Sequence, residues 1–246
     1  MRFKSDVGSN HSGGQPVVIR TLRIEYVTYQ KMKKYLLILG IMLMGLFSCS
    51  AKTNEEKFWN WFCKNSQSIY NFESNQEAIF DKLQAQLQKV NPCLTFEISS
   101  IKNGKREFVI STDGIIDAFP AVENLYKAKP ELAEWEFIKF RPRRKIENSI
   151  KIGNKELYPK DIKFMFVDDE DKSKTGIVLF CNGYNENEYD VYNQIGFLFL
   201  DESLGEFDTE TYIGNIFIQG FDSEYFGQST EIESLAVEFD KIKNAN

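Results

Sequence analysis

LTFEISSIKNGKREFVI, residues 94–110, predicts a β-hairpin, and this hairpin decides the fold class. Apolar residues alternate with polar ones on both sides of its centre, as expected of strands that bury one face. Asn103-Gly104 at the centre is a strong signal for a two-residue turn, because both residues tolerate positive φ. The alternating apolar residues are Leu94, Phe96 and Ile98 before the turn and Phe108 and Ile110 after it.

Amphipathic helices are predicted on both sides of this hairpin. Ser74 and Glu77 have the spacing of a capping box, and apolar residues recur at helical spacing over residues 79–90. Thr230 and Glu233 repeat the capping-box spacing ahead of the last helix.

Strands dominate the second half of the chain. Residues 176–181, GIVLFC, have the unbroken apolar character of a central strand, whereas residues 188–203 favour a helix. Because helices and hairpins are interspersed rather than strictly alternating, the sequence predicts an α+β fold with a largely antiparallel sheet and helices packed on it. We find no linker and no internal repeat, so residues 58–246 are expected to form a single domain. Further strands are expected over residues 135–140, 150–157, 162–166 and 212–218.

Four aromatic residues crowd the segment FWNWF, residues 58–62. Aromatic side chains bury large apolar areas, so we expect a helix that inserts these rings into the core. An exposed aromatic binding surface is the alternative.

Residues 32–50, MKKYLLILGIMLMGLFSCS, have the layout of a secretory signal peptide. Lysines are followed by an uncharged apolar run and then by small residues around Cys49. The run is shorter than the roughly 20 residues that a membrane-spanning helix needs. Since a signal peptide acts from the amino terminus, we expect residues 1–31 to be an upstream extension from a misassigned start codon, with Met32 as the working start. A genuine long leader is the alternative.

The end of this signal, LFSC at residues 46–49, resembles the lipobox of bacterial lipoproteins. The resemblance implies that a peptidase removes residues 32–48 and that the Cys49 thiol carries a lipid. Residues 49–57 would then be the lipidated cysteine and a polar tether. Two or three acyl chains anchor a protein stably. The resemblance therefore implies a domain in the bacterial cell envelope, tethered to a membrane and facing the periplasm or the exterior.

Removal of residues 1–48 changes the chemistry available to the chain. The removed part contains His11, the only histidine, together with seven of the 30 Lys/Arg and two of the 36 Asp/Glu residues. The remainder has 23 basic and 34 acidic residues, a net charge of −11 that repels nucleic acid. Without histidine, Ser-His triads, Cys-His pairs and histidine metal ligands are excluded.

Three charged clusters are candidates for chemistry. Residues 168–171, DDED, offer oxygen ligands, but Lys174 and Phe180 stand where a calcium loop needs glycine and glutamate, so we expect a solvated turn. A basic cluster could hold an anion, although a charged strand end that discourages edge pairing is preferred. An acidic cluster could contain a catalytic pair. The basic cluster is Arg141, Arg143, Arg144 and Lys145, and the acidic cluster is Asp201, Glu202, Glu206, Asp208 and Glu210.

Three cysteines remain beside the lipidated one. A disulfide between Cys63 and Cys93 is possible, and Cys181 is expected to be a buried apolar residue. The absence of a CxxC spacing gives no support for a metal or redox site.

Three longer segments carry a second resemblance. FWNWF, VISTDGIIDAFPAVENLYKAKPELAEWEFIKFRPR (109–143) and LDESLGEFDTETYIGNI (200–216) together look like a family of uncharacterised bacterial proteins. The likeness spans most of the mature chain and implies no activity and no site residues.

These observations favour a lipid-anchored envelope protein that binds a protein or glycan partner without catalysis, and we expect no metal and no cofactor. A cationic secreted toxin would suit the acidic chain if it is an immunity-type lipoprotein. The alternative is a histidine-free hydrolase that works through carboxylates. Two acids in an apolar cleft with pKa values shifted apart would favour the enzyme.

Overall fold

The computed structural model describes residues 51–244. The predicted extension over residues 1–31, the signal peptide and the lipidation site at Cys49 lie outside the described residues and stay predictions. Within residues 51–244, no helix is both long and apolar enough to cross a bilayer.

The fold is α+β, as predicted, and the strands of the described residues form three sheets. The α-helices are α2 (Asn54–Tyr70), α3 (Gln76–Leu87), α4 (Phe119–Lys127), α5 (Tyr189–Leu204), α6 (Glu206–Tyr212) and α7 (Leu235–Lys243). The strands are β1 (Thr95–Ile98), β2 (Arg106–Ser111), β3 (Trp135–Lys139), β4 (Ile150–Ile152), β5 (Lys155–Leu157), β6 (Ile162–Asp168), β7 (Thr175–Cys181), β8 (Ile213–Gly220) and β9 (Thr230–Glu231).

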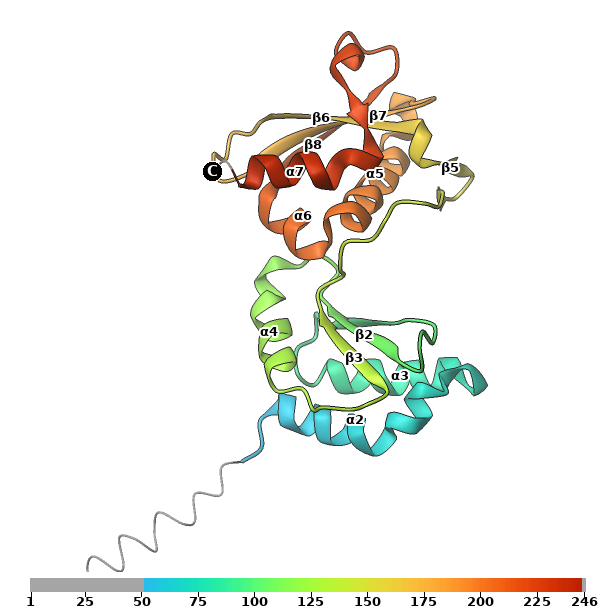
Figure 1. Ribbon diagram of the computed structural model, residues 1–246, viewed down its shortest axis with the longest axis vertical. Coiled ribbons are helices and arrows are strands. Elements are labelled where there is room, and N and C mark those ends of the chain that lie inside the picture. Colours follow the sequence, from blue (N-terminus) through green and yellow to red (C-terminus); the bar gives the residue numbers. More distant parts are fainter. Residues whose placement is uncertain (1–50, 245–246) are drawn as a thin grey trace, which may run out of the picture. The chain divides into compact units, whose positions relative to one another are not determined.

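Both larger sheets contain an antiparallel hairpin followed by a helical crossover to a parallel strand (Figure 1). In the sheet β1-β2-β3, α4 connects β2 to the parallel strand β3. In the sheet β8-β7-β6-β9, α5 and α6 connect β7 to the parallel strand β8. β4 and β5 form a separate hairpin. Pairing is therefore largely antiparallel, as predicted, but the two parallel pairs were not foreseen.

The hairpin at residues 94–110 is confirmed. Asn103 and Gly104 have φ of 52° and 74°, as a two-residue hairpin turn with two positive φ angles requires. The backbone groups of Lys102 and Lys105 exchange hydrogen bonds of 2.9 and 3.0 Å across the turn. Phe96 pairs with Ile110, so both apolar faces of the hairpin lie on the same side of the sheet.

The FWNWF segment lies in α2 and supplies three rings to a first hydrophobic core. Phe62 is fully buried, and its ring lies edge-on to the rings of Phe108 and Trp135 at 5.1 Å between centroids. Trp59 is also buried, and its indole N–H donates to the Leu125 carbonyl at 2.7 Å. The core interpretation is thus confirmed for three of the four aromatics, whereas Trp61 is only half-buried.

A second hydrophobic core lies between the four-stranded sheet and the helices α5 and α7, which cover one of its faces (Figure 1). β7 is buried along nearly its whole length, as predicted for a central strand. The α5 residues that enter this core are Tyr192, Ile195, Phe199, Leu200 and Leu204.

Two predicted helix starts are wrong. Ser74 does not cap α3, because its hydroxyl donates to the Asn71 carbonyl at 3.1 Å within a short 3₁₀ turn. Thr230 lies in β9 and pairs with Phe164 of β6, which keeps its backbone extended. The last α-helix therefore begins only at Leu235.

The start of α2 also differs from expectation. Thr53 and Glu56 form a complete capping box, with Glu56 N–H donating to the Thr53 hydroxyl at 3.2 Å. The helix therefore begins at Asn54, inside the segment 49–57 that we expected to be a tether.

Phe62→Ala is expected to lower the free energy of unfolding by about 3–5 kcal/mol, because a buried ring is replaced by a cavity. Urea denaturation of the purified protein measures the loss. The neighbouring Cys63→Ala is a matched control, since Cys63 is exposed on the same helix. Similar losses in both variants would contradict the assigned core.

Candidate functional site

The acidic cluster lies where α5 ends and α6 begins, and Glu206 is its most deeply buried member. The Glu206 residue is 0% exposed. A carboxylate at this depth needs strong hydrogen bonds to offset the loss of water.

Backbone N–H groups supply these bonds. Glu206 Oε1 accepts from the N–H of Thr112 at 3.0 Å and of Gly114 at 3.1 Å, and Oε2 accepts from the N–H of Arg141 at 3.1 Å. The Thr112 hydroxyl adds a bond of 3.2 Å, and Glu206 N–H donates back to the Arg141 carbonyl at 3.0 Å. We call this set of bonds the Glu206 clamp. It joins the start of α6 to the segments that follow β2 and β3, and so links the two cores.

Two glycines allow the clamp to close. Gly205 has φ of 76°, and a Cβ there would lie 2.9 Å from the Arg141 carbonyl oxygen. Gly114 has φ of 83°, and a Cβ there would collide with the carboxylate of Glu210. Both positions therefore require glycine, for backbone conformation and for space.

Residues with unusual backbone conformation flank the clamp. Asp113 and Phe140 have φ of 50° and 60°, a region that bulky residues rarely occupy. Phe140 N–H donates to the Ile110 carbonyl at 2.7 Å, which fixes the conformation just before Arg141. Such conformations persist where neighbouring contacts determine them, as the clamp does here.

Two arginines of the basic cluster, Arg141 and Arg143, pair with the acidic cluster, whereas the Arg144 side chain lies near Glu97 and Glu107. Arg141 Nε lies 2.7 Å from Asp201 Oδ2, although its N–H points at no acceptor in the described part of the chain, so this contact is mainly ionic. Arg143 lies 2.5 Å from Asp208 and 2.9 Å from Asp240. Both arginines connect the segment after β3 to α5, α6 and α7. Arg143 is nevertheless exposed, as expected of a charged strand end, whereas Arg141 is half-buried.

Four members of the acidic cluster have shifted pKa values, and not all in one direction. Burial raises the pKa of Glu202 despite the opposing charge of Arg144. Burial is the largest single effect on the pKa of Glu206, and it raises this pKa. Hydrogen bonds from backbone N–H groups together outweigh burial and hold the pKa below the ordinary value. Burial raises the pKa of Asp201 despite the opposing charge of Arg141. Burial, together with the charges of Asp201 and Glu206, raises the pKa of Glu210. Shifts of this kind occur at catalytic sites and in structural ion networks alike.

The DDED turn is structural. Asp169 is 7% exposed, and its carboxylate accepts from the backbone N–H of Asn215 at 2.6 Å and of Asp171 at 2.9 Å. A Cβ at Gly214 would collide with this carboxylate. The expected turn is present, but Asp169 is buried against β8 rather than solvated. Within residues 51–244, no group of three or more His, Cys, Asp or Glu side chains could hold a metal ion.

The three cysteines of the described chain are unpaired, so the disulfide considered between Cys63 and Cys93 is not formed. Cys181 is buried in β7, as predicted, and burial raises its pKa to about 12. A thiol in this state is a poor nucleophile.

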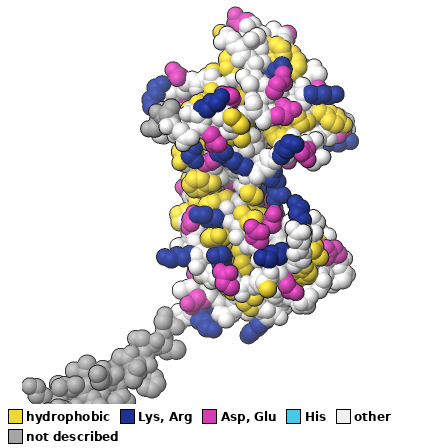
Figure 2. Space-filling model, viewed as in Figure 1, with side chains coloured by type: hydrophobic (Ala, Val, Ile, Leu, Met, Phe, Trp, Pro, Cys, Tyr) yellow, Lys and Arg dark blue, Asp and Glu magenta, His cyan; other side chains and the backbone are white. Residues whose placement is uncertain are grey.

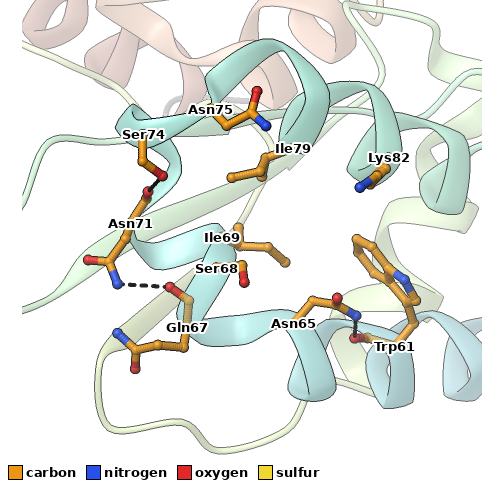
Figure 3. Close-up of a pocket in the computed structure, with 10 residues that line it drawn as sticks. All are labelled: Trp61, Asn65, Gln67, Ser68, Ile69, Asn71, Ser74, Asn75, Ile79 and Lys82. Atoms are coloured by element: carbon orange, nitrogen blue, oxygen red, sulfur yellow. Dashed lines mark hydrogen bonds between the residues drawn. The ribbon is translucent and has the colours of Figure 1, made fainter.

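A cavity of about 460 Å³ lies between α2 and α3 (Figure 3). Unlike the charged clusters, it is lined mainly by uncharged residues. Trp61 projects into it from α2 and Lys82 from α3, with Ile69 and Ile79 between the two helices. No carboxylate lines it in the described part of the chain. The remaining lining residues all carry amide or hydroxyl groups: Asn65, Gln67, Ser68, Asn71, Ser74 and Asn75.

Arg106 fixes the turn that closes this cavity. It is 2% exposed, and its guanidinium donates to the carbonyls of Tyr70 and Ser99 at 2.7 Å and pairs with Glu73. The guanidinium also lies 4.6 Å from the ring centroid of Phe72. Sequence reasoning missed this residue, because an arginine after a hairpin turn normally faces solvent.

No protein-family model, curated protein or solved structure matches this chain. The likeness to uncharacterised bacterial proteins stays a prediction.

Glu206→Gln is expected to lower the free energy of unfolding by about 2–4 kcal/mol at neutral pH, because buried N–H groups lose a charged acceptor. The wild-type contribution is present above the ordinary carboxyl pKa and is lost as pH falls through the lower pKa of the folded state. The variant should therefore lose less stability than the wild type on acidification.

Urea denaturation at neutral and acid pH tests this expectation. Glu131→Gln is the control, since Glu131 is exposed. A Glu206→Gln protein as stable as this control at neutral pH would show that the clamp contributes nothing.

Proposed function

We propose that this chain is a lipid-tethered protein of the bacterial cell envelope that binds a ligand without chemical turnover. The leader at residues 32–48 and the lipobox-like sequence ending at Cys49 support the tether. The binding role rests on the way in which the charged groups of the described chain are used.

The carboxylates most suited to catalysis are already engaged in hydrogen bonds or ion pairs within the fold. Glu206 is held by backbone N–H groups, and Asp201 and Asp208 face arginines. The cavity between α2 and α3 has neither a carboxylate nor a cysteine among its lining residues. Lys82 makes no hydrogen bond to Ser68 or Ser74 within residues 51–244, so no serine is paired there with a base. The lining residues of the cavity therefore support a binding role rather than a catalytic one.

On the face that Figure 2 shows, the outer surface has no stronger candidate for a ligand-binding site than this cavity. Lys and Arg side chains are interspersed there with Asp and Glu, and neither sign gathers into one large patch. Interspersed charges give solubility rather than recognition of a strongly charged partner.

A carboxylate-dependent hydrolase is the second candidate, and the shifted pKa values favour it. Asp201 and Glu210 have raised pKa values beside Glu206, whose pKa is lowered. A catalytic pair must, however, reach a substrate, and Glu206 is fully buried with both oxygens engaged. Asp201 is 7% exposed and paired with Arg141. We therefore prefer the binding role.

Metabolic labelling with radioactive palmitate tests the tether. The wild-type protein should incorporate label in a bacterial host, and Cys49→Ala should not, because acylation requires the thiol at residue 49. Cys63→Ala is the control and should label normally. Equal labelling of Cys49→Ala would remove the tether from the proposal.

Hydrolysis assays test the absence of turnover. The purified protein should show no activity on ester, peptide, phosphate or glycoside substrates. The binding role would be overturned by a reproducible rate that Asp201→Asn or Glu210→Gln abolishes and that the exposed-site control Glu233→Gln retains. Circular dichroism would establish that the inactive variants are folded.

A further inference from the structure

We infer that the cavity between α2 and α3 is a saccharide-binding site in which Trp61 is the stacking platform. The inference rests on the proposed function, because a tether outside the cytoplasm would expose the cavity to envelope glycans. Its volume of about 460 Å³ lies in the range of small-ligand sites, roughly 300–1,000 Å³.

Trp61 differs from the other two tryptophans of the chain. Trp59 and Trp135 are each 4% exposed, and their indole N–H groups donate to Leu125 and Ser66. Trp61 is half-buried and lines the cavity, and its indole N–H has no acceptor within residues 51–244. It therefore offers both a flat apolar face and a free donor. The C–H face of a pyranose ring packs on such a surface, while its hydroxyls reach the polar groups around it.

The polar groups suit hydroxyls in particular. An amide side chain has both donors and acceptors, as a sugar hydroxyl does, so the two can bond in either direction. Asn65 uses its amide nitrogen for the Trp61 carbonyl at 2.8 Å, which leaves its amide oxygen available. Ser68 and Asn75 make no side-chain hydrogen bond within the described residues. Ligand hydroxyls would replace the water that these groups bind in the free protein.

The charge on the cavity lining narrows the class of ligand further. Lys82 is its only charged lining residue and makes no ion pair within residues 51–244. A neutral sugar would leave this ammonium in solvent, whereas the carboxylate of a uronic acid could pair with it. The site should therefore prefer a carboxylated saccharide to a neutral one.

The three tryptophans provide a direct test. The full-length protein, with ¹⁵N-labelled indoles, gives one N–H signal each for Trp59, Trp61 and Trp135. Titration with tetragalacturonate and with maltotetraose should shift the Trp61 signal and leave the two buried indoles unchanged. The galacturonate should bind more tightly, and Lys82→Gln should remove that preference.

Variants separate recognition from folding. Isothermal titration calorimetry measures their affinities, because the two Trp61 variants lack the Trp61 signal. Trp61→Ala should weaken galacturonate binding by roughly tenfold or more, because the stacking surface is lost. Trp61→Phe should retain part of the affinity, since it keeps an aromatic face. Lys57→Ala, an exposed change on the same helix, should bind as the wild type does.

Two outcomes would overturn the inference. One is a Trp61 signal that neither saccharide moves at tens of millimolar, and the other is undiminished binding by a folded Trp61→Ala protein. Neither would affect palmitate labelling at Cys49 or the absence of hydrolysis, so failure of the saccharide site is distinguishable from failure of the proposed function.

Discussion

The buried carboxylate of Glu206 is the constraint on which the arrangement of the two cores depends. One side chain at the start of α6 satisfies the backbone N–H groups of Thr112, Gly114 and Arg141. These residues follow β2 and β3, so a single group from the second core organises two chain segments of the first. The glycine at 205 and the positive φ of Phe140 follow from this demand, because the chain must approach closely and turn sharply there.

The clamp region also shows how the fold uses many of the charged residues of the described chain. Acids and arginines that lie far apart in the sequence converge at the clamp, and most of them neutralise one another there. Their shifted pKa values follow from burial and pairing. The cavity between α2 and α3 has the opposite character, since its donors and acceptors are largely neutral and several remain free. The proposed binding role therefore rests on hydrogen-bonding groups that have no partner within residues 51–244.

Local elements were predictable from the sequence, whereas long-range contacts were not. The Asn103-Gly104 turn and the buried strand at residues 176–181 follow from turn chemistry and hydrophobic pattern, which act over a few residues. The predicted cap at Ser74 is absent, because Arg106, thirty-two positions later in the chain, determines the shape of the turn before α3. The sequence identified Glu206 only as one member of an acidic cluster, since pattern alone does not reveal partners about 90 residues away. The cavity was not predicted. The alternative interpretation of FWNWF, an exposed aromatic binding surface, stays a proposal for Trp61, which is half-buried and lines the cavity.

Amide hydrogen exchange tests the Glu206 clamp most directly. The account predicts that the N–H groups of Thr112, Gly114 and Arg141 exchange slowly with solvent at neutral pH, although all three lie outside strands and helices. In Glu206→Ala, these three amides should exchange much faster, while Phe108 in the middle of β2 should keep more of its protection. Fast exchange of all three amides in the wild-type protein, at rates typical of exposed loops, would contradict the claim that one buried carboxylate joins the two cores.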